Sequence, residues 1–212
     1  MGHPPFADRA AAGRELAAEL AKHETDGSPV VLGLARGGME VAAEVARALD
    51  AELDVLVVRK VGHPLQPELG LGALAEDGEP VFDETGLART GLDEDDLAEV
   101  VATERAEARR RVEVYRRGRP PVDVTGRPVV LVDDGIATGV SARAALRALR
   151  ARHPSRLVLA VPVAAGEALK QLAADADEEV ALLVPSRFGA VSQWYERFDQ
   201  TSDAQVVALL AR

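Results

Sequence analysis

Two adjacent carboxylates, Asp133 and Asp134, directly follow four apolar residues at positions 129–132. An apolar run this short, without polar alternation, predicts a strand that is buried on both faces, as in a parallel sheet. Small residues follow, and an alanine-rich helical pattern spans 140–150. Open α/β folds bind their ligands at the carboxyl edge of the sheet. The two acids therefore stand where they could contact a ligand.

The turn after the acids has a composition that suits a phosphate group. It offers two hydroxyls and several backbone N–H groups at a predicted helix N-terminus. Its residues are Ala137, Thr138, Gly139, Val140 and Ser141. The fixed order of acids, Thr-Gly and Ser favours a sugar-phosphate site. The alternatives are an ordinary strand end followed by a helix cap, and the acid pairs that phosphatases and signalling receivers carry at strand ends.

A second strand–turn–helix unit precedes this one. Residues 30–34 form a short apolar strand pattern, Arg36, Gly37 and Gly38 lie in the turn, and a helical pattern covers 39–49. Adjacent glycines let the backbone approach a ligand closely, and Arg36 adds a cation. The alternative is a plain helix start with a solvent-facing arginine.

A third predicted strand, residues 53–58, runs into two cations, Arg59 and Lys60. Such a charge pair is usually a solvated strand end. The stretch 61–71 contains two glycines and two prolines, so we expect an irregular loop there. His63 and Glu68 lie in this loop, and neither is assigned a catalytic role.

The segment 129–141 resembles the diphosphate-sugar signature of the type I phosphoribosyltransferases: an apolar strand, two acids, three variable residues, Thr-Gly, one residue, then Ser or Thr. The resemblance implies that Asp133 and Asp134 face the ribose of phosphoribosyl pyrophosphate, near or bound to Mg²⁺. It also implies that residues 137–141 hold the 5′-phosphate. Val140 departs from the family pattern, since many relatives have Gly or Ala there.

The same resemblance extends to the two earlier segments. Arg36 and Gly37 look like part of the family's pyrophosphate loop, and Arg59 and Lys60 stand where the family places cations for pyrophosphate oxygens. A mobile lid at 61–71 would exclude water from a cation-like sugar.

The remaining patterns complete an α/β chain. We expect helices at 6–22 (capped by Asp8), 93–117, 166–174 and 203–210, further strands at 156–161 and 179–184, and a hairpin that joins 72–75 to 80–82 through Asp-Gly. This alternation predicts an open, largely parallel twisted sheet with helices on both faces. We expect a single phosphoribosyltransferase-like domain over 1–212, with its core at about 30–185.

The tail, residues 186–212, holds an aromatic cluster of Phe188, Trp194, Tyr195 and Phe198. These rings could form a hydrophobic plug under the last helix. Alternatively, they could form a small hood in which a ring stacks on a nucleobase. The family builds its hood from terminal segments, so both interpretations stay open.

Composition narrows the class of protein. The net charge of −10 argues against a general nucleic-acid binder. The absence of cysteine excludes thiolate chemistry and is compatible with a reducing cytosol. No apolar run approaches membrane-spanning length, so we expect a cytoplasmic protein without a membrane partner.

The resemblance implies an enzyme, a phosphoribosyltransferase of nucleotide metabolism. It would transfer the phosphoribosyl group of phosphoribosyl pyrophosphate to a nitrogen acceptor, with Mg²⁺ as cofactor and pyrophosphate as product. Family members often form homodimers. Two alternatives remain: a non-catalytic regulator that senses phosphoribosyl pyrophosphate or a nucleotide, and a Mg²⁺-dependent phosphohydrolase that uses the acid pair.

Overall fold

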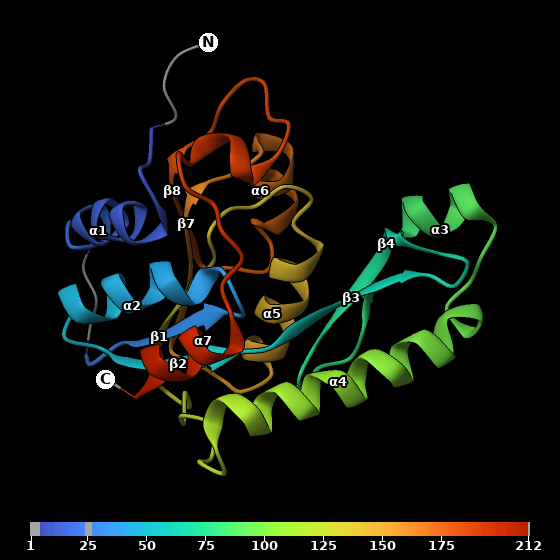
Figure 1. The fold of residues 1–212 in the computed structure, drawn as a ribbon, viewed down its shortest axis with the longest axis horizontal. Helices are drawn as coiled ribbons and strands as arrows, with labels where there is room; N and C mark the ends of the chain where they lie inside the picture. The colour runs from blue at the N-terminus through green and yellow to red at the C-terminus, as the bar shows by residue number, and fades with distance from the viewer. Residues whose placement is uncertain (1–4, 24–26, 212) are drawn as a thin grey trace.

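A computed structural model describes residues 5–23 and 27–211 of the chain. Its centre is a sheet of five parallel strands in the order β2-β1-β6-β7-β8 (Figure 1). The strands are β1 (Val30–Leu34), β2 (Glu52–Leu56), β6 (Pro128–Val132), β7 (Arg156–Val163) and β8 (Glu178–Leu183). The order places β1 and β6 side by side, with Val30 opposite Val129 and Gly33 opposite Val132. The turns that follow these two strands therefore meet at one edge of the sheet.

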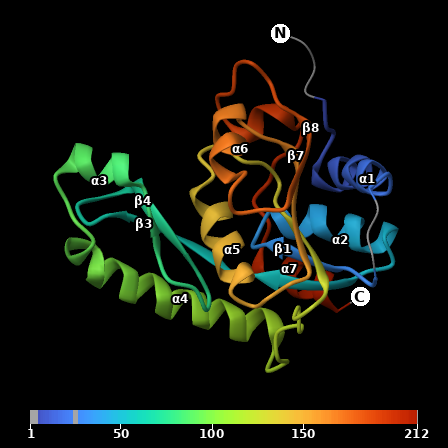
Figure 2. The ribbon, with the colours of Figure 1, turned by 180° about the vertical axis from the view of Figure 1, so that it is seen from behind.

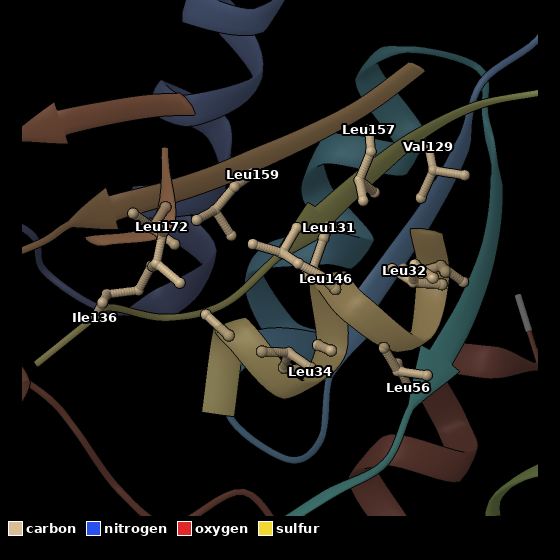
Figure 3. Close-up of a cluster of buried hydrophobic side chains, with 14 of the residues drawn as sticks. Leu32, Leu34, Leu56, Val129, Leu131, Ile136, Leu146, Leu157, Leu159 and Leu172 are labelled. Carbon is tan, nitrogen blue, oxygen red and sulfur yellow. The ribbon is translucent and has the colours of Figure 1, made fainter. Parts of the chain in front are cut away.

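Helices cover both faces of this sheet because each strand alternates its apolar side chains between them. One face packs against α5 (Val140–Arg150) and α6 (Gly166–Leu172), and Figure 3 shows the cluster, which includes Leu32, Leu131 and Leu159 from the strands and Leu146 from α5. The other face, with Val31 and Val130, packs against α1 (Arg9–Leu20) and α2 (Gly38–Ala48). The predicted fold class is thereby confirmed.

A second sheet of three antiparallel strands extends away from the first (Figures 1 and 2). It consists of β3 (Val58–His63), β4 (Gln66–Ala75) and β5 (Val81–Phe82). The short helix α3 (Glu84–Thr90), the 3₁₀ turn η1 (Asp95–Leu97) and the long helix α4 (Ala98–Arg116) follow it. We call β3 to α4 the arm. The predicted hairpin is confirmed, since Ala73 pairs with Val81.

The predicted irregular loop at 61–71 is wrong, because these residues continue β3 and form most of β4. The register between the two strands shifts on both sides of Gly62, which pairs with Gly70. A Cβ on Gly62 would lie 2.3 Å from the carbonyl oxygen of Pro67, so the two backbones cross there at close range. Glycine and proline here permit an irregular hairpin, whereas on sequence grounds they indicate a loop.

A buried group of charges connects the arm to the central sheet. The Arg116 side chain, at the end of α4, donates to Glu76 Oε1 at 2.6 Å and to the carbonyl oxygen of Val55 at 2.7 Å. Its Nε lies 3.2 Å from Asp54 Oδ2, and all three charged side chains are buried. The pKa of Glu76 is raised by its burial, although Arg116 opposes the shift.

After β8 the chain returns to the other edge of the central sheet, where its last helix lies near β2. The 3₁₀ turn η2 (Val191–Trp194) leads to an extended segment and then to α7 (Asp203–Leu210), which packs near α2 and α4. The helices at 140–150 and 203–210 and the strand at 30–34 have the predicted bounds, and Asp8 caps α1 as predicted, accepting from Ala11 N at 2.8 Å. None of the helices in the described ranges is long and apolar enough to cross a lipid bilayer.

Candidate active site

The acid pair lies at the carboxyl end of the buried strand β6. Asp133 and Asp134 are both half-buried, and Asp133 Oδ1 accepts a hydrogen bond from the backbone N–H of Asp134 at 2.8 Å. Tyr195 donates its hydroxyl to the carbonyl oxygen of Asp134 at 2.5 Å. The position of the second acid is therefore fixed by the tail of the chain as well as by the strand.

Arg9, the first residue of α1, is the partner of Asp134. Its Nε donates to Asp134 Oδ2 at 2.7 Å, and its Nη1 donates to the carbonyl oxygen of Asp199 at 2.6 Å. The guanidinium carbon lies 3.8 Å from the centroid of the Phe198 ring, a cation–π geometry. Arg9 is only 6% exposed, so this cation is a fixed part of the site.

The Arg36-Gly37-Gly38 turn packs directly on the acids. A Cβ on Gly37 would lie 2.0 Å from Asp134 Oδ2, and a Cβ on Gly38 would lie 2.9 Å from the Cα of Asp133. Gly37 has an ordinary helical φ of −58°, so it is space and not backbone conformation that requires a glycine there. The two strand–turn–helix units predicted from the sequence therefore meet at their turns.

A cavity of about 330 Å³ opens at this edge of the sheet. Its walls come from the acids, the following turn, one arm residue and both terminal segments. The lining residues are Arg9, Lys60, Asp133, Asp134, Gly135, Ile136, Ala137, Thr138, Gly139, Ser141, Ala142, Val191 and Phe198. Of the predicted ribose and phosphate residues, Val140 is outside this lining and faces a neighbouring cavity with Arg143.

Gly139 has a specific backbone role in the turn. Its φ of +78° lies in the left-handed region, which glycine adopts without a steric penalty. The turn leads into α5 at Val140. The first N–H groups of a helix have no partner within the helix and carry a partial positive charge. With the hydroxyls of Thr138 and Ser141, they suit an anionic group in the cavity.

The four predicted pyrophosphate residues are distributed unequally. Lys60 lines the cavity, and its charge opposes the raised pKa of Asp133. Gly37 lies against Asp134 and is not part of the lining. Arg59 donates from Nε to Glu104 Oε2 on α4 at 2.7 Å. Arg36 is the fourth, and its Nη1 lies 3.6 Å from Asp203 Oδ1.

The two acids differ in their electrostatic surroundings. Burial raises the pKa of Asp133 well above its usual value, and the neighbouring charge of Asp134 adds to the shift. Burial also raises the pKa of Asp134, but Arg9 opposes that shift through its charge and its hydrogen bond. Glu40 on α2 adds a further negative charge near Asp134. Arg9 and Lys60 are thus the cations that balance an acidic cluster.

The donor set does not by itself fit a resident metal ion. In residues 5–23 and 27–211, no group of three or more His, Cys, Asp or Glu side chains is arranged to hold one. One oxygen of Asp134 is also taken by Arg9. Mg²⁺ commonly binds through one or two carboxylates together with substrate phosphates. These residues therefore suit a metal ion that arrives with a phosphorylated substrate.

The aromatic tail contributes both to the core and to the cavity. The ring of Tyr195 lies 5.5 Å from Phe6 and 5.0 Å from Phe198, centroid to centroid, and Tyr195 is buried with Phe6. Phe198 and Val191 line the cavity. Trp194 stacks on Phe188 with centroids 6.4 Å apart, outside that lining. Stacking of a base on Phe198 stays a prediction.

Sequence reasoning missed Arg9 and Val191. Arg9 stands in an alanine-rich helix start, and no local pattern distinguishes it from a solvent-exposed arginine. Its partner Asp134 is 125 positions away. Only an indirect signal could have indicated Arg9. Two acids at the end of a buried strand need a counter-charge, and an arginine that directly follows a helix-capping residue has a fixed backbone position from which it could supply one.

Comparisons with known proteins identify relatives of this chain. A family model described as the phosphoribosyl transferase domain matches residues 7–183. Two Mycobacterium tuberculosis proteins, from strains CDC 1551 and H37Rv, carry provisional phosphoribosyl transferase names. Each is 49% identical over 207 residues, which cover 98% of this chain and 46% of the relative. The chain thus spans about half the length of the curated relatives that it matches.

Two solved structures are also similar to this chain. The crystal structure of the TT1426 protein from Thermus thermophilus is 49% identical, with a TM-score of 0.80 and 97% of each chain covered. The AQ2163 protein from Aquifex aeolicus is 16% identical, with a TM-score of 0.52 over 85% of this chain and 76% of the other. The second similarity concerns the fold alone.

Proposed function

Since the chain belongs to the phosphoribosyl transferase domain family, we propose that it transfers a phosphoribosyl group from phosphoribosyl pyrophosphate to a nitrogen acceptor, with release of pyrophosphate. The observation that carries the proposal is the set of residues that line one cavity. Asp133 and Asp134 lie in it together with Thr138, Gly139, Ser141 and Lys60. This set matches a molecule with a sugar, a phosphate on one side and a pyrophosphate on the other.

The proposed roles follow from charge. The N–H groups and hydroxyls of residues 137–141 would bind the 5′-phosphate, and the acids would accept hydrogen bonds from the ribose hydroxyls. When the bond from C1 to the pyrophosphate oxygen breaks, positive charge develops on the sugar and negative charge on the leaving group. Fixed charges that complement such changes are usually the largest contribution to catalysis. The acids would stabilise the sugar, and Lys60 the pyrophosphate.

Mg²⁺ enters this proposal as part of the substrate, bound to the pyrophosphate of phosphoribosyl pyrophosphate. It would neutralise leaving-group charge, as metal ions do in phosphoryl transfer. A metal-binding role for Asp133 and Asp134 stays a prediction.

We further propose a nucleobase as the nitrogen acceptor, in the nucleotide metabolism of the cytoplasm. The support is the wall formed by Val191 and the Phe198 ring, which is apolar and partly flat. Base–aromatic stacking is sequence-tolerant and is worth about 1–3 kcal/mol per base. Two chains could form a homodimer, as the resemblance allows.

Isothermal titration with phosphoribosyl pyrophosphate and Mg²⁺ tests the first step. We expect the wild type to bind, and the Asp133→Asn/Asp134→Asn double variant to lose binding while keeping its circular dichroism spectrum. Asp95→Asn, which changes an exposed acid in η1, is the matched control and should bind normally. No binding by folded wild type would contradict the proposal.

Pyrophosphate release in the presence of a panel of purine and pyrimidine bases tests the second step. Release that depends on one base would identify the acceptor. Binding without turnover on any nitrogen acceptor would favour a regulator that senses the ligand. Phosphate release without any acceptor would favour a phosphohydrolase.

A further inference from the structure

Arg9 places a buried cation directly against one member of the acid pair. Its Nε lies 2.7 Å from Asp134 Oδ2, and the side chains of the two residues are only 7% and 15% exposed. Burying two opposite charges in contact is favourable only where their remaining hydrogen-bonding groups are also satisfied. Here the carbonyl oxygen of Asp199 accepts from Nη1, and the Phe198 ring covers one face of the guanidinium.

The position of Arg9 is set before any ligand arrives. The residues just before it are bound to the tail, since Glu196 N donates to the carbonyl oxygen of Phe6 at 2.8 Å and Arg197 N to that of Ala7 at 3.0 Å. Asp8 then caps α1. The guanidinium therefore enters the cavity from a fixed helix start. The conformational entropy of its side chain is lost when the protein folds and not when a ligand binds.

The charges around the pair differ between the two acids: Arg9 acts on both, and Lys60 adds a smaller effect on Asp133. Asp134 faces Arg9, with Glu40 as a nearby acid, and Glu40 accepts from Thr201 Oγ1 at 2.5 Å. Asp133 uses Oδ1 for the backbone N–H of Asp134 and lies within the field of Lys60. The charge of Asp133 is thus offset by Arg9 and, to a smaller extent, by Lys60 on the arm, whereas Asp134 is the acid that Arg9 contacts directly.

We propose that Arg9 is a positioning residue that acts as a built-in cation: it occupies Asp134 in place of a metal ion and leaves Asp133 as the carboxylate that faces the ligand. The ligand-facing part of this inference rests on the proposed function. The cation part does not, because it concerns only the ligand-free protein. Its consequence is that the acid pair holds no divalent cation until a phosphorylated substrate brings one.

Manganese binding to the ligand-free full chain tests the cation part. Free Mn²⁺ is measured by electron paramagnetic resonance during a titration. We expect negligible binding to the wild type and an affinity gain of about tenfold or more in Arg9→Met, because removal of one partner leaves a buried carboxylate without its counter-charge. Arg9→Lys should return affinity toward the wild-type level, and Arg9→Met/Asp134→Asn should abolish the gain.

The matched control is Arg197→Met. Arg197 pairs with Asp8 in the same contact between the chain's two terminal segments, but its side chain is 66% exposed and it is absent from the cavity lining. This variant should behave as the wild type. A structural role of Arg9 alone would lower the melting temperature of Arg9→Met without changing its Mn²⁺ affinity, and that result would overturn the proposal.

Mn²⁺ titration of the wild type and of Asp134→Asn is a second test, and it does not depend on whether an Arg9 variant folds. If ligand-free wild type binds Mn²⁺ and Asp134→Asn abolishes the binding, Arg9 does not exclude the metal and the proposal fails. Titration with phosphoribosyl pyrophosphate and Mg²⁺ separates the two proposals. No binding by the wild type would defeat the proposed function, while the Mn²⁺ result would still decide the cation role of Arg9.

Discussion

Tyr115 and Asp203 join the arm to the last helix by a hydrogen bond of 2.7 Å, donated by the tyrosine hydroxyl to Asp203 Oδ1. The same carboxylate oxygen lies 3.6 Å from Nη1 of Arg36, in the glycine turn beside the acids. The pKa of Tyr115 is raised to about 12, mainly by its burial and then by the hydrogen bond to Asp203. The carboxylate of Asp203 thus contacts Tyr115 of the arm and also lies near Arg36, a residue predicted to bind pyrophosphate.

This arrangement predicts that Asp203 competes with pyrophosphate for Arg36. Asp203→Asn removes the competing charge and keeps an oxygen that can accept from Tyr115. Partly exposed ion pairs are worth about 0.2–1 kcal/mol, so we expect pyrophosphate affinity to rise by a factor of about 1.5–5. Calorimetric titration with pyrophosphate and Mg²⁺ measures it, with Arg36→Met expected to bind more weakly than the wild type. A weaker Asp203→Asn complex would show that Asp203 orients Arg36 for the ligand.

The buried charges at the base of the arm predict a large effect on stability. Arg116→Met leaves Asp54 and Glu76 buried without their cation, which costs about 3–5 kcal/mol of the free energy of unfolding. Urea denaturation measures the loss. Arg117→Met changes the next arginine, which is exposed, and should stay within about 0.5 kcal/mol of the wild type. Similar losses in both variants would mean that arginine at the end of α4 acts through helix capping.

The same conservative change should have opposite effects at the two acids. Asp133 has a raised folded-state pKa, so its ionised form destabilises the fold above the unfolded value of 3.8. Asp133→Asn should therefore stabilise the protein at neutral pH by about 0.5–2 kcal/mol, as substitutions at strained functional sites do. The pKa of Asp134 is raised as well, but Asp134→Asn leaves Arg9 buried without its charged partner, and we expect this cost to make the variant less stable than the wild type.

The pH dependence provides the check on this sign. Since the folded-state pKa of Asp133 is raised, the stability gain of Asp133→Asn is largest above the folded pKa and disappears as the pH falls to about 3.8, the unfolded value. Melting temperatures from pH 4 to 8 measure it. A gain that stays constant over this range would exclude the carboxyl charge as its cause.

The space beside Gly37 predicts a specific sensitivity. In Gly37→Ala the new methyl group would lie 2.0 Å from Asp134 Oδ2 and 2.9 Å from Arg9 Nε, so the acid pair must shift. Overpacking of this kind costs about 1–3 kcal/mol, and we expect weaker binding of phosphoribosyl pyrophosphate as well. Gly70→Ala is the matched control, because no atom lies within 4 Å of its Cβ position. Equal effects in thermal melts of both variants would contradict the steric argument.

The sequence was sufficient for most of the central sheet, because local signals and tertiary packing agree there. The strand predicted at 53–58 is an exception: β2 ends at Leu56 and Val58 begins β3 of the second sheet, so Arg59 and Lys60 do not lie at the end of a central strand. The apolar run that becomes β6 can be buried on both faces, and α5 begins at the residue after the left-handed Gly139. The arm was harder to predict. Gly62 and Pro67 are typical loop residues, yet here they allow β3 and β4 to approach each other closely. This role depends on the pairing of the two strands, which cannot be recognised from the local sequence.

The candidate site, too, could be predicted from the sequence only in part. The acids and the turn were predicted at the end of a strand, and the structure places them around one cavity with Lys60. Lys60 was also expected at a strand end, but it lies within β3. Whether they bind the proposed substrate stays a prediction. Arg59 and Arg36 carried the same kind of signal as Lys60, but Glu104 and Asp203 lie close enough to pair with them. Such partners come from distant elements, so residue type alone could not separate the three cations.

The contact between Arg9 and Asp199 has a consequence for biosynthesis. These residues are 190 positions apart, and ribosomes add about 5–20 residues per second. The strands and helices of the central sheet are all translated before the tail that seats the guanidinium against Phe198. During synthesis, the contact that fixes the counter-charge of the acid pair can therefore form only after all five strands of the central sheet have been translated.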